Sequence, residues 1–164
     1  MKVKMLLLLL ALLCLVGCKG VKTEEKQNTD IEPIEKVDVR EEKDKVVIQA
    51  EQGKMEISSD AGQDLDLPEG FPAEKLPVYP KGSIVVSECV NNVYNVGIVT
   101  NDNVESIYKY YKKNLNADSI TSDMLSGESA NLFLQDGEKV GAIMIMPNNL
   151  PYDFKYVIFI TYGE

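Results

Sequence analysis

The chain has 164 residues, with 26 acidic and 17 basic side chains and no histidine. Its formal charge of −9 lacks the basic footprint that nucleic acids and anionic lipid headgroups require, so neither is expected as a partner. The absence of histidine removes the commonest general base and the commonest metal ligand, together with every Ser-His and Cys-His catalytic arrangement.

A short apolar segment at the start of the chain indicates export. Lys2 and Lys4 precede residues 5–16, an unbroken apolar stretch. This stretch has the length of a signal peptide and is too short for a stable membrane span. The segment is therefore predicted to be a cleaved export signal.

The residues that close this segment predict the site of cleavage. Leu15-Val16-Gly17-Cys18 resembles the bacterial lipobox, in which the cysteine becomes lipidated and then N-terminal. The resemblance implies a signal peptide over residues 1–17, cleavage between Gly17 and Cys18, and a diacylglycerol and palmitate-type anchor on Cys18. The expected location is the extracytoplasmic face of the cell membrane, held by lipid. The alternatives are an ordinary secretory signal with a chance cysteine and an uncleaved hydrophobic anchor.

Residues 18–45 are predicted to form the lipidated cysteine and a disordered acidic tether. After Cys18 the composition is dominated by Lys, Glu, Asp, Gln, Asn and Thr, and no aromatic residue occurs. So little apolar area cannot offset the entropy cost of ordering the chain. A flexible tether of this length has a root-mean-square span of about 30 Å. Loss of residues 1–17 removes two lysines and no acid, which takes the formal charge to −11.

The next two segments predict a hairpin and an extended strap. Residues 46–48 and 55–57 are apolar and flank Gln52-Gly53, which predicts a short β-hairpin over residues 46–58. This hairpin is expected either to pack on the main domain or to stand alone. Residues 65–80 contain four prolines, which forbid regular structure and predict an extended path across the domain surface.

A second hairpin and a helix are predicted next. Residues 84–90 and 93–99 are rich in β-branched residues, and Asn91-Asn92 between them tolerates the positive φ of a two-residue turn. Asp102 or Asn103 is then placed to cap a helix. Apolar residues at helical spacing define its buried face: Val104, Ile107, Tyr108, Tyr111 and Leu115.

The remaining chain is predicted to be β-structure. Asp136-Gly137 is a strong hairpin signal. The predicted fold is α+β, with one antiparallel β-sheet packed against a single amphipathic helix in the order β-β-α-β-β-β, over residues 59–164. Strand patterns after the helix occur at residues 119–125, 130–135, 139–146 and 154–162, which is one more than the three strands of this order.

Several short motifs resemble a recurrent module of bacterial secreted and lipid-anchored proteins. The resemblance covers residues 46–164 and implies a small α+β domain, with no established activity, ligand or catalytic residue to transfer. Asn116-Ala117-Asp118 stands where such modules often have a Gly-Trp pair. The motifs are Leu67-Pro68-Glu69-Gly70-Phe71-Pro72, Leu76-Pro77-Val78-Tyr79-Pro80, Thr100-Asn101-Asp102-Asn103 and the pair Tyr110-Tyr111.

The sequence offers little for catalysis. Ser106 and Lys109 match a serine-x-x-lysine spacing, but no Ser-Asp-Asn or Lys-Thr-Gly partner motif accompanies them. Cys89 would be the last free thiol after processing, and its apolar surroundings predict a buried structural role. We therefore expect no enzymatic activity, no cofactor and no metal site.

Tyrosine is used generously and predicts a recognition surface. Tyr110 falls off the apolar stripe of the helix and Tyr152 lies in a proline-bounded loop, so these two are the candidate binding residues. The expected function is a non-catalytic extracytoplasmic binding module for an envelope protein or a cell-wall component. The alternative is a small-solute-binding or sensory accessory lipoprotein of a transporter or receptor.

Overall fold

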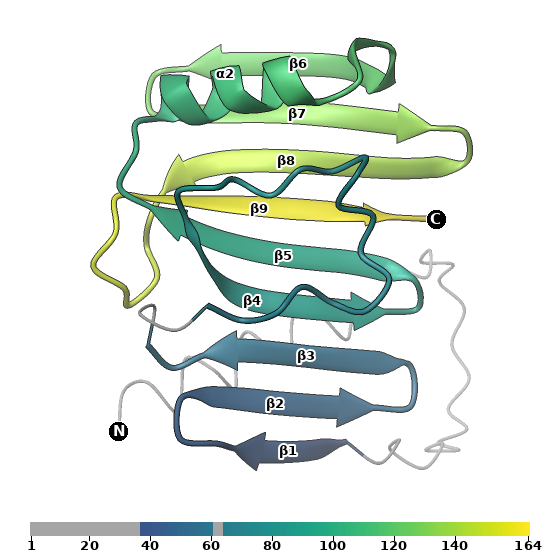
Figure 1. The fold of residues 1–164 in the computed structure, drawn as a ribbon, viewed down its shortest axis with the longest axis vertical. Coiled ribbons are helices and arrows are strands. Elements are labelled where there is room, and N and C mark those ends of the chain that lie inside the picture. Colours follow the sequence, from purple (N-terminus) through teal and green to yellow (C-terminus); the bar gives the residue numbers. More distant parts are fainter. Residues whose placement is uncertain (1–36, 61–63) are drawn as a thin grey trace, which may run out of the picture. The chain divides into compact units, whose positions relative to one another are not determined.

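The structure is a computed structural model that describes residues 37–60 and 64–164 (Figure 1). All described residues belong to one compact unit, Glu35–Glu164. The predictions for the signal peptide, for Cys18 and for most of the tether lie outside the described residues. No helix in the described ranges is long and apolar enough to cross a bilayer.

One antiparallel sheet organises the described residues. Its strand order is β1-β2-β3-β4-β5-β9-β8-β7-β6. One α-helix, α2 (Val104–Asn114), and a 3-10 turn, η1 (Ala117–Ser119), accompany it. The strands are β1 (Asp38–Glu41), β2 (Lys45–Ala50), β3 (Gly53–Ser58), β4 (Ser83–Val90), β5 (Val93–Thr100), β6 (Ile120–Ser126), β7 (Ser129–Asp136), β8 (Lys139–Pro147) and β9 (Tyr156–Gly163).

Two meanders share this sheet. β1 to β5 run consecutively from one edge to the centre, and α2 then carries the chain across to β6 at the other edge (Figure 1). β6 to β9 return to the centre, where β9 pairs with β5 from Tyr94↔Tyr162 to Thr100↔Tyr156. The last strand of the chain therefore joins the two halves.

The predicted fold class is wrong, because the protein is mostly β. The hairpin expected over residues 46–58 is not separate: β3 pairs with β4 from Gly53↔Val90 to Ile57↔Val86 and extends the sheet. A Cβ at Gly53 would lie 2.0 Å from the carbonyl oxygen of Cys89, so only glycine permits this close pairing. β1 lies within the expected tether and adds a further strand by pairing with β2. A nine-stranded sheet thus replaces the smaller β-β-α-β-β-β arrangement.

The local turn and cap predictions are confirmed. Asn91 and Asn92 have φ values of 51° and 62°, the left-handed geometry of the two-residue hairpin turn. The side chain of Asn103 accepts a hydrogen bond from the backbone N–H of Ser106 and caps α2. Asp136 pairs with Lys139 across the predicted turn.

The main core lies between the sheet and a cover made by α2 and the strap, residues 65–80. Ile107 and Tyr111 of α2 and Leu76 of the strap are buried there. They pack against the face of the sheet that carries Leu132 and Ile160. Burial of such side chains contributes about 1.5–3 kcal/mol each, so this layer dominates the stability of the fold.

The opposite face of the sheet has a smaller cluster under the loop that joins β8 to β9. Val85, Val99 and Val157 are buried there, and Tyr152 of the loop packs on them. The same face carries a buried acid, Glu88, which accepts a hydrogen bond of 2.7 Å from the Asn95 side chain. Burial raises the pKa of Glu88, and the hydrogen bond from Asn95 offsets this only in part.

Glu88 therefore makes a pH-dependent contribution to stability. Because its pKa is higher in the folded state, the protein is stabilised when Glu88 is protonated and loses that contribution as pH rises through the folded pKa. Glu88→Gln keeps an acceptor for Asn95 and removes the charge, so it should raise the melting temperature at pH 7. The gain should disappear below about pH 4, where both proteins are neutral at this position. Calorimetric melting curves across this pH range measure it, and an equal shift at every pH would contradict the assignment.

Candidate functional site

Three exposed apolar side chains form a patch on the sheet face opposite α2. Met124, Phe133 and Val140 come from β6, β7 and β8, and their side chains are 55 %, 48 % and 58 % exposed. The register places them together. Phe133 lies opposite Ser122 of β6, two residues before Met124, and opposite Ala142 of β8, two residues after Val140. Diagonal neighbours of this kind are within contact range for long side chains. We call these three residues the outer patch.

The outer patch adjoins a free strand edge. β6 is the last strand of the sheet, and all of its residues after Ile120 are exposed. The other edge strand, β1, has four residues, three of which are charged. Short, charged edges resist pairing with further strands, whereas a longer edge with few charges does not. β6 is therefore the more accessible edge.

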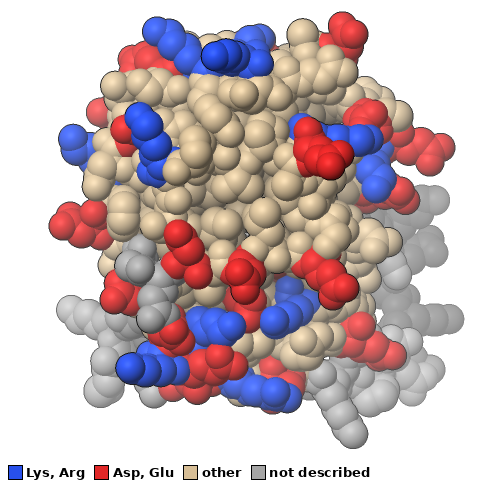
Figure 2. Space-filling view, in the orientation of Figure 1, with Lys and Arg blue, Asp and Glu red and all other residues tan. Residues whose placement is uncertain are grey.

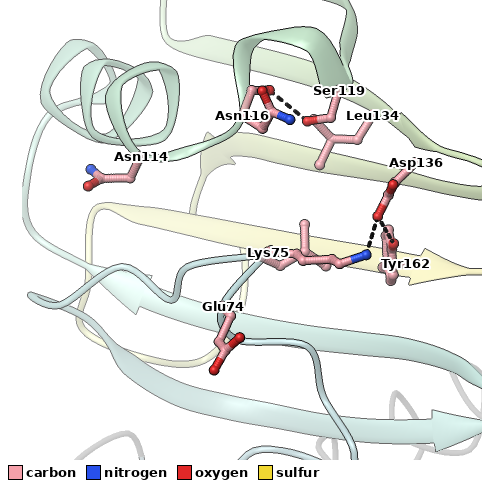
Figure 3. A pocket seen from close by; sticks show the side chains of 9 residues that line it. Glu74, Lys75, Asn114, Asn116, Ser119, Leu134, Asp136 and Tyr162 are labelled. Atoms are coloured by element: carbon pink, nitrogen blue, oxygen red, sulfur yellow. Dashed lines mark hydrogen bonds and ion pairs between the residues drawn. The ribbon is translucent and has the colours of Figure 1, made fainter.

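A polar cleft lies on the sheet face that carries α2, beside the C-terminal end of this helix (Figure 3). Its volume is about 230 Å³, and it opens beside a shallower groove of about 480 Å³. The cleft is lined by Glu74, Lys75, Leu76, Asn114, Asn116, Ser119, Leu134, Asp136 and Tyr162. Figure 3 shows that its strap side chains come from below, while those of η1 and β7 come from above.

One ion pair dominates the electrostatics of the cleft. The ammonium of Lys75 lies 2.5 Å from the carboxylate of Asp136, to which the Tyr162 hydroxyl also donates a hydrogen bond of 3.4 Å. Hydrogen bonding to Asp136 raises the pKa of Lys75, and the same bond lowers the pKa of Asp136. Both charges are satisfied within the protein, so the cleft presents no unpaired charge from this pair to a ligand.

The two tyrosines predicted from the sequence lie on opposite faces of the sheet. The Tyr110 hydroxyl donates a hydrogen bond of 2.8 Å to the carbonyl of Val78 in the strap. The Tyr152 hydroxyl donates one of 2.6 Å to the carbonyl of Ser58, at the end of β3. Both side chains are half-buried and hold loops to the fold, and the structure does not bring them together. Their role in binding stays a prediction.

The other residues considered from sequence have plain structural surroundings. Ser106 and Lys109 are exposed on α2, and no catalytic partner motif adjoins them in the sequence. Cys89 is half-buried and unpaired, on the strand position opposite Tyr94. Within residues 37–60 and 64–164, no group of three or more potential metal-ligating side chains is close enough to hold an ion.

The outer patch was not predicted from the sequence, although the sequence contains part of its pattern. Phe133 lies between Leu132 and Leu134, so its side chain points to the face of β7 opposite the two leucines. Because a single helix covers only one face of a sheet, either the leucines or Phe133 had to lie on the face without a helix. The order of β6 to β8 at the far edge, which decides that this face is exposed, is not encoded in any short motif.

Comparison of the chain with known protein families, with curated proteins and with solved structures finds no match. The candidate sites therefore rest on geometry alone.

Two neighbouring tyrosines provide a test of the strap attachment. The Tyr111 hydroxyl is buried and has no hydrogen-bond partner among the described residues, whereas the Tyr110 hydroxyl bonds to the strap. Tyr110→Phe should lower the free energy of unfolding by about 1 kcal/mol, because a net hydrogen bond is lost. Tyr111→Phe should leave it unchanged or raise it by up to about 1 kcal/mol. Chemical denaturation measures both, and equal losses in the two variants would contradict this assignment.

Proposed function

We propose that the protein is a non-catalytic, lipid-anchored binding module of the cell envelope, and that the outer patch is its binding surface. The observation that carries the proposal is the exposure of Met124, Phe133 and Val140 together on an uncovered part of the sheet. Isolated exposed apolar residues need no explanation, but a contiguous group on one face indicates an interaction site. The partner is an envelope protein or a cell-wall component.

The size of the outer patch sets the strength of such binding. Full burial of one large apolar side chain contributes about 1.5–3 kcal/mol, and each of the three is already about half buried. Contacts of this size do not by themselves offset the cost of association, which is at least several kcal/mol. The proposal therefore needs either further contacts around the outer patch or a high local concentration of the partner.

The proposed lipid anchor would supply the high local concentration of the partner. A lipid on Cys18 would confine the domain to the membrane surface. Because β1 begins at Asp38, the linker from Cys18 is shorter than the predicted tether; its root-mean-square span of about 25 Å would let the domain search only the adjacent layer of the envelope. Confinement of two binding partners in such a layer raises their effective concentration towards the millimolar range. A weak surface of this kind would then be occupied in the cell and released on extraction.

A second candidate, binding of a small solute by an accessory lipoprotein, rests on the cleft. Its volume of about 230 Å³ lies below the range of about 300–1,000 Å³ that is usual for ligand pockets. The adjoining groove increases the available space, and Lys75, Asp136 and Tyr162 line both. If a solute binds there, Asp136→Asn, which breaks the ion pair with Lys75 and changes the charge of the cleft, should change its affinity and leave partner capture by the outer patch intact.

The anchoring part of the proposal predicts the behaviour of Cys18→Ala. This variant cannot receive a thioether-linked lipid, so it should either move from the detergent phase to the aqueous phase on detergent partitioning or stay misprocessed, with the added mass of residues 1–17. Intact-mass measurement should show that the mature wild-type chain is heavier than its sequence by the mass of the lipid. Retention of the variant in the detergent phase, with the mass of the wild-type protein unchanged by lipid, would exclude lipid anchoring.

The binding part of the proposal predicts the loss of a partner from Phe133→Glu. In-cell crosslinking of a C-terminally tagged full chain, followed by mass spectrometry, should identify one dominant envelope partner. Phe133→Glu should reduce its yield by about tenfold, because a charge in an apolar contact costs at least about 1.4 kcal/mol.

Val39→Glu is the matched control for this experiment. Val39 is 58 % exposed and lies on the same face of the sheet as Phe133. The two residues stand at the ends of one row of directly paired residues that crosses the sheet, with one residue from each intervening strand. The control sits at the opposite edge of the sheet and should keep the full yield. Equal losses in both variants would mean that charge, and not the outer patch, determines capture.

A further inference from the structure

The three N-terminal strands carry almost all of their charge on the sheet face that bears α2. Glu56 of β3 pairs with Ser87 and through it with Val96, which is buried under the helix and strap. Since side chains alternate along a strand, this register places all but one of the charged side chains of β1–β3 on the same face, where Figure 2 shows them crowded. They are Asp38, Arg40, Lys45, Lys54 and Glu56, and the exception is Glu41.

The opposite face of the same half of the sheet is apolar. On β1–β5 and β9, its only charged side chains are Glu41 and Glu88, and these strands direct no lysine or arginine to it. Its larger apolar side chains are half-buried, because neighbouring strands shield them only in part. A sheet face of this composition is stable when a second layer covers it. We call the following eight residues the N-terminal face: Val46, Ile48, Met55, Ile57, Val86, Val90, Val93 and Phe159.

The N-terminal face is large enough for a specific interface. The loop that carries Tyr152 packs only on the cluster of Val85, Val99 and Val157 at one end of these strands. Six strands about 4.8 Å apart, with about six residues of each left open, give a surface of about 29 by 20 Å, or about 600 Å². Two such faces in contact would bury about 1,200 Å² in total, which is the lower limit for specific and stable protein interfaces.

A second copy of the chain is the partner that this face matches. A two-fold axis brings the same surface of two copies together, so an apolar face finds an apolar face of equal size. Both sheets also have the same right-handed twist, which lets them pack face to face at about −30°. The formal charge of −9 makes two copies repel each other, and the repulsion is least where charge is sparse. The N-terminal face is such a region.

The strand order defines how two such faces can overlap and leave the outer patch free. A two-fold axis parallel to the strands, between β3 and β4, would place β1, β2 and β3 of one copy over β9, β5 and β4 of the other. The strands β8, β7 and β6 would then extend beyond β1 of the second copy, so both outer patches stay accessible. This axis also keeps the N-terminal ends of both β1 strands at the same end of the dimer. Two lipid anchors could therefore reach one membrane.

We infer that two copies of the chain pack their N-terminal faces against each other and form a β-sandwich dimer. The inference goes beyond the proposed function, because the N-terminal face and the outer patch are different parts of the sheet and can be occupied at the same time. An interface of about 1,200 Å² gives a reversible dimer. Confinement of both copies to one membrane surface, at an effective concentration towards the millimolar range, would keep it assembled.

The test captures one copy of the full chain with another. Two copies with different C-terminal tags are expressed together, crosslinked in cells with formaldehyde and purified through the first tag. Ile48→Glu in both copies should lower the yield of the second tag by about tenfold, because it places a charge in an apolar contact. Gln49→Glu is the matched control: it adds the same charge at the next residue of β2, on the face that bears α2, and should keep the full yield.

A second variant should strengthen the dimer, so that a folding defect cannot imitate the expected result. Glu88 accepts a hydrogen bond from Asn95 and lies on β4, which the two-fold axis places over β3 of the other copy. The large side chains of β3 on this face are Met55 and Ile57, so dimer formation would remove the Glu88 charge further from water. Glu88→Gln should lower the dimer dissociation constant about tenfold at pH 7. Sedimentation of the processed full chain in density-matched detergent measures this constant.

The outcomes separate this inference from the proposed function. The dimer is wrong if the wild-type chain captures no second tag, if Ile48→Glu and Gln49→Glu lose yield equally, or if Glu88→Gln leaves the dissociation constant unchanged. Phe133→Glu should keep the dimer, and its loss in that variant would contradict an interface outside the outer patch. If Phe133→Glu releases no envelope partner while the two tags still purify together, the proposed binding surface is wrong and the dimer stands.

Discussion

The pairing of β5 with β9 is the contact on which the rest of the structure depends. It joins two meanders that would otherwise be separate sheets, through seven residue pairs from Tyr94↔Tyr162 to Thr100↔Tyr156. The side chains of Val96, Ile98, Ile158 and Ile160 on these two strands are fully buried under the helix and strap. The partners are about sixty residues apart in sequence, so the entropy cost of closing that loop must be met before the core forms.

The cover over the sheet is uneven, and this decides where a partner can bind. On the helix-bearing face, α2 and the strap bury the part of the sheet around β5, β9, β8 and β7. Over β2 and β3 the same face is polar, where Glu56 is held by Lys45 at 2.7 Å and by Lys54 at 3.0 Å; Figure 2 shows charged side chains of both signs crowded there. On the opposite face, the loop around Tyr152 covers only the cluster of Val85, Val99 and Val157. The outer patch is what remains uncovered at the C-terminal meander.

Local structure was predictable from sequence because its causes are local. The Asn91-Asn92 turn, the Asn103 cap and the apolar stripe of α2 depend on residues within one or two turns of chain, and all three are present. The number of strands in the sheet was not predictable in this way. It depends on the pairing of β3 with β4, two strands that the strap separates in sequence. Gly53 permits this pairing, but in the sequence it indicates only a turn. The two candidate binding residues, Tyr110 and Tyr152, do not lie together for a related reason. A tyrosine exposed for binding and a tyrosine whose hydroxyl holds a loop to the fold have the same sequence context.

The positions of β1 and β6 at opposite edges have a mechanical consequence. The chain enters the sheet at β1, and eight inter-strand steps of about 4.8 Å separate that strand from β6, a distance of about 38 Å. A pull between the N-terminal chain and a partner held on the outer patch at Met124 of β6 would run along the inter-strand hydrogen bonds and load the eight pairings in series. The weakest of these is β1 with β2, where only four residues pair and every residue of β1 is exposed. Under tension this strand would peel away first and lengthen the linker, while the core between β5 and β9 stayed closed.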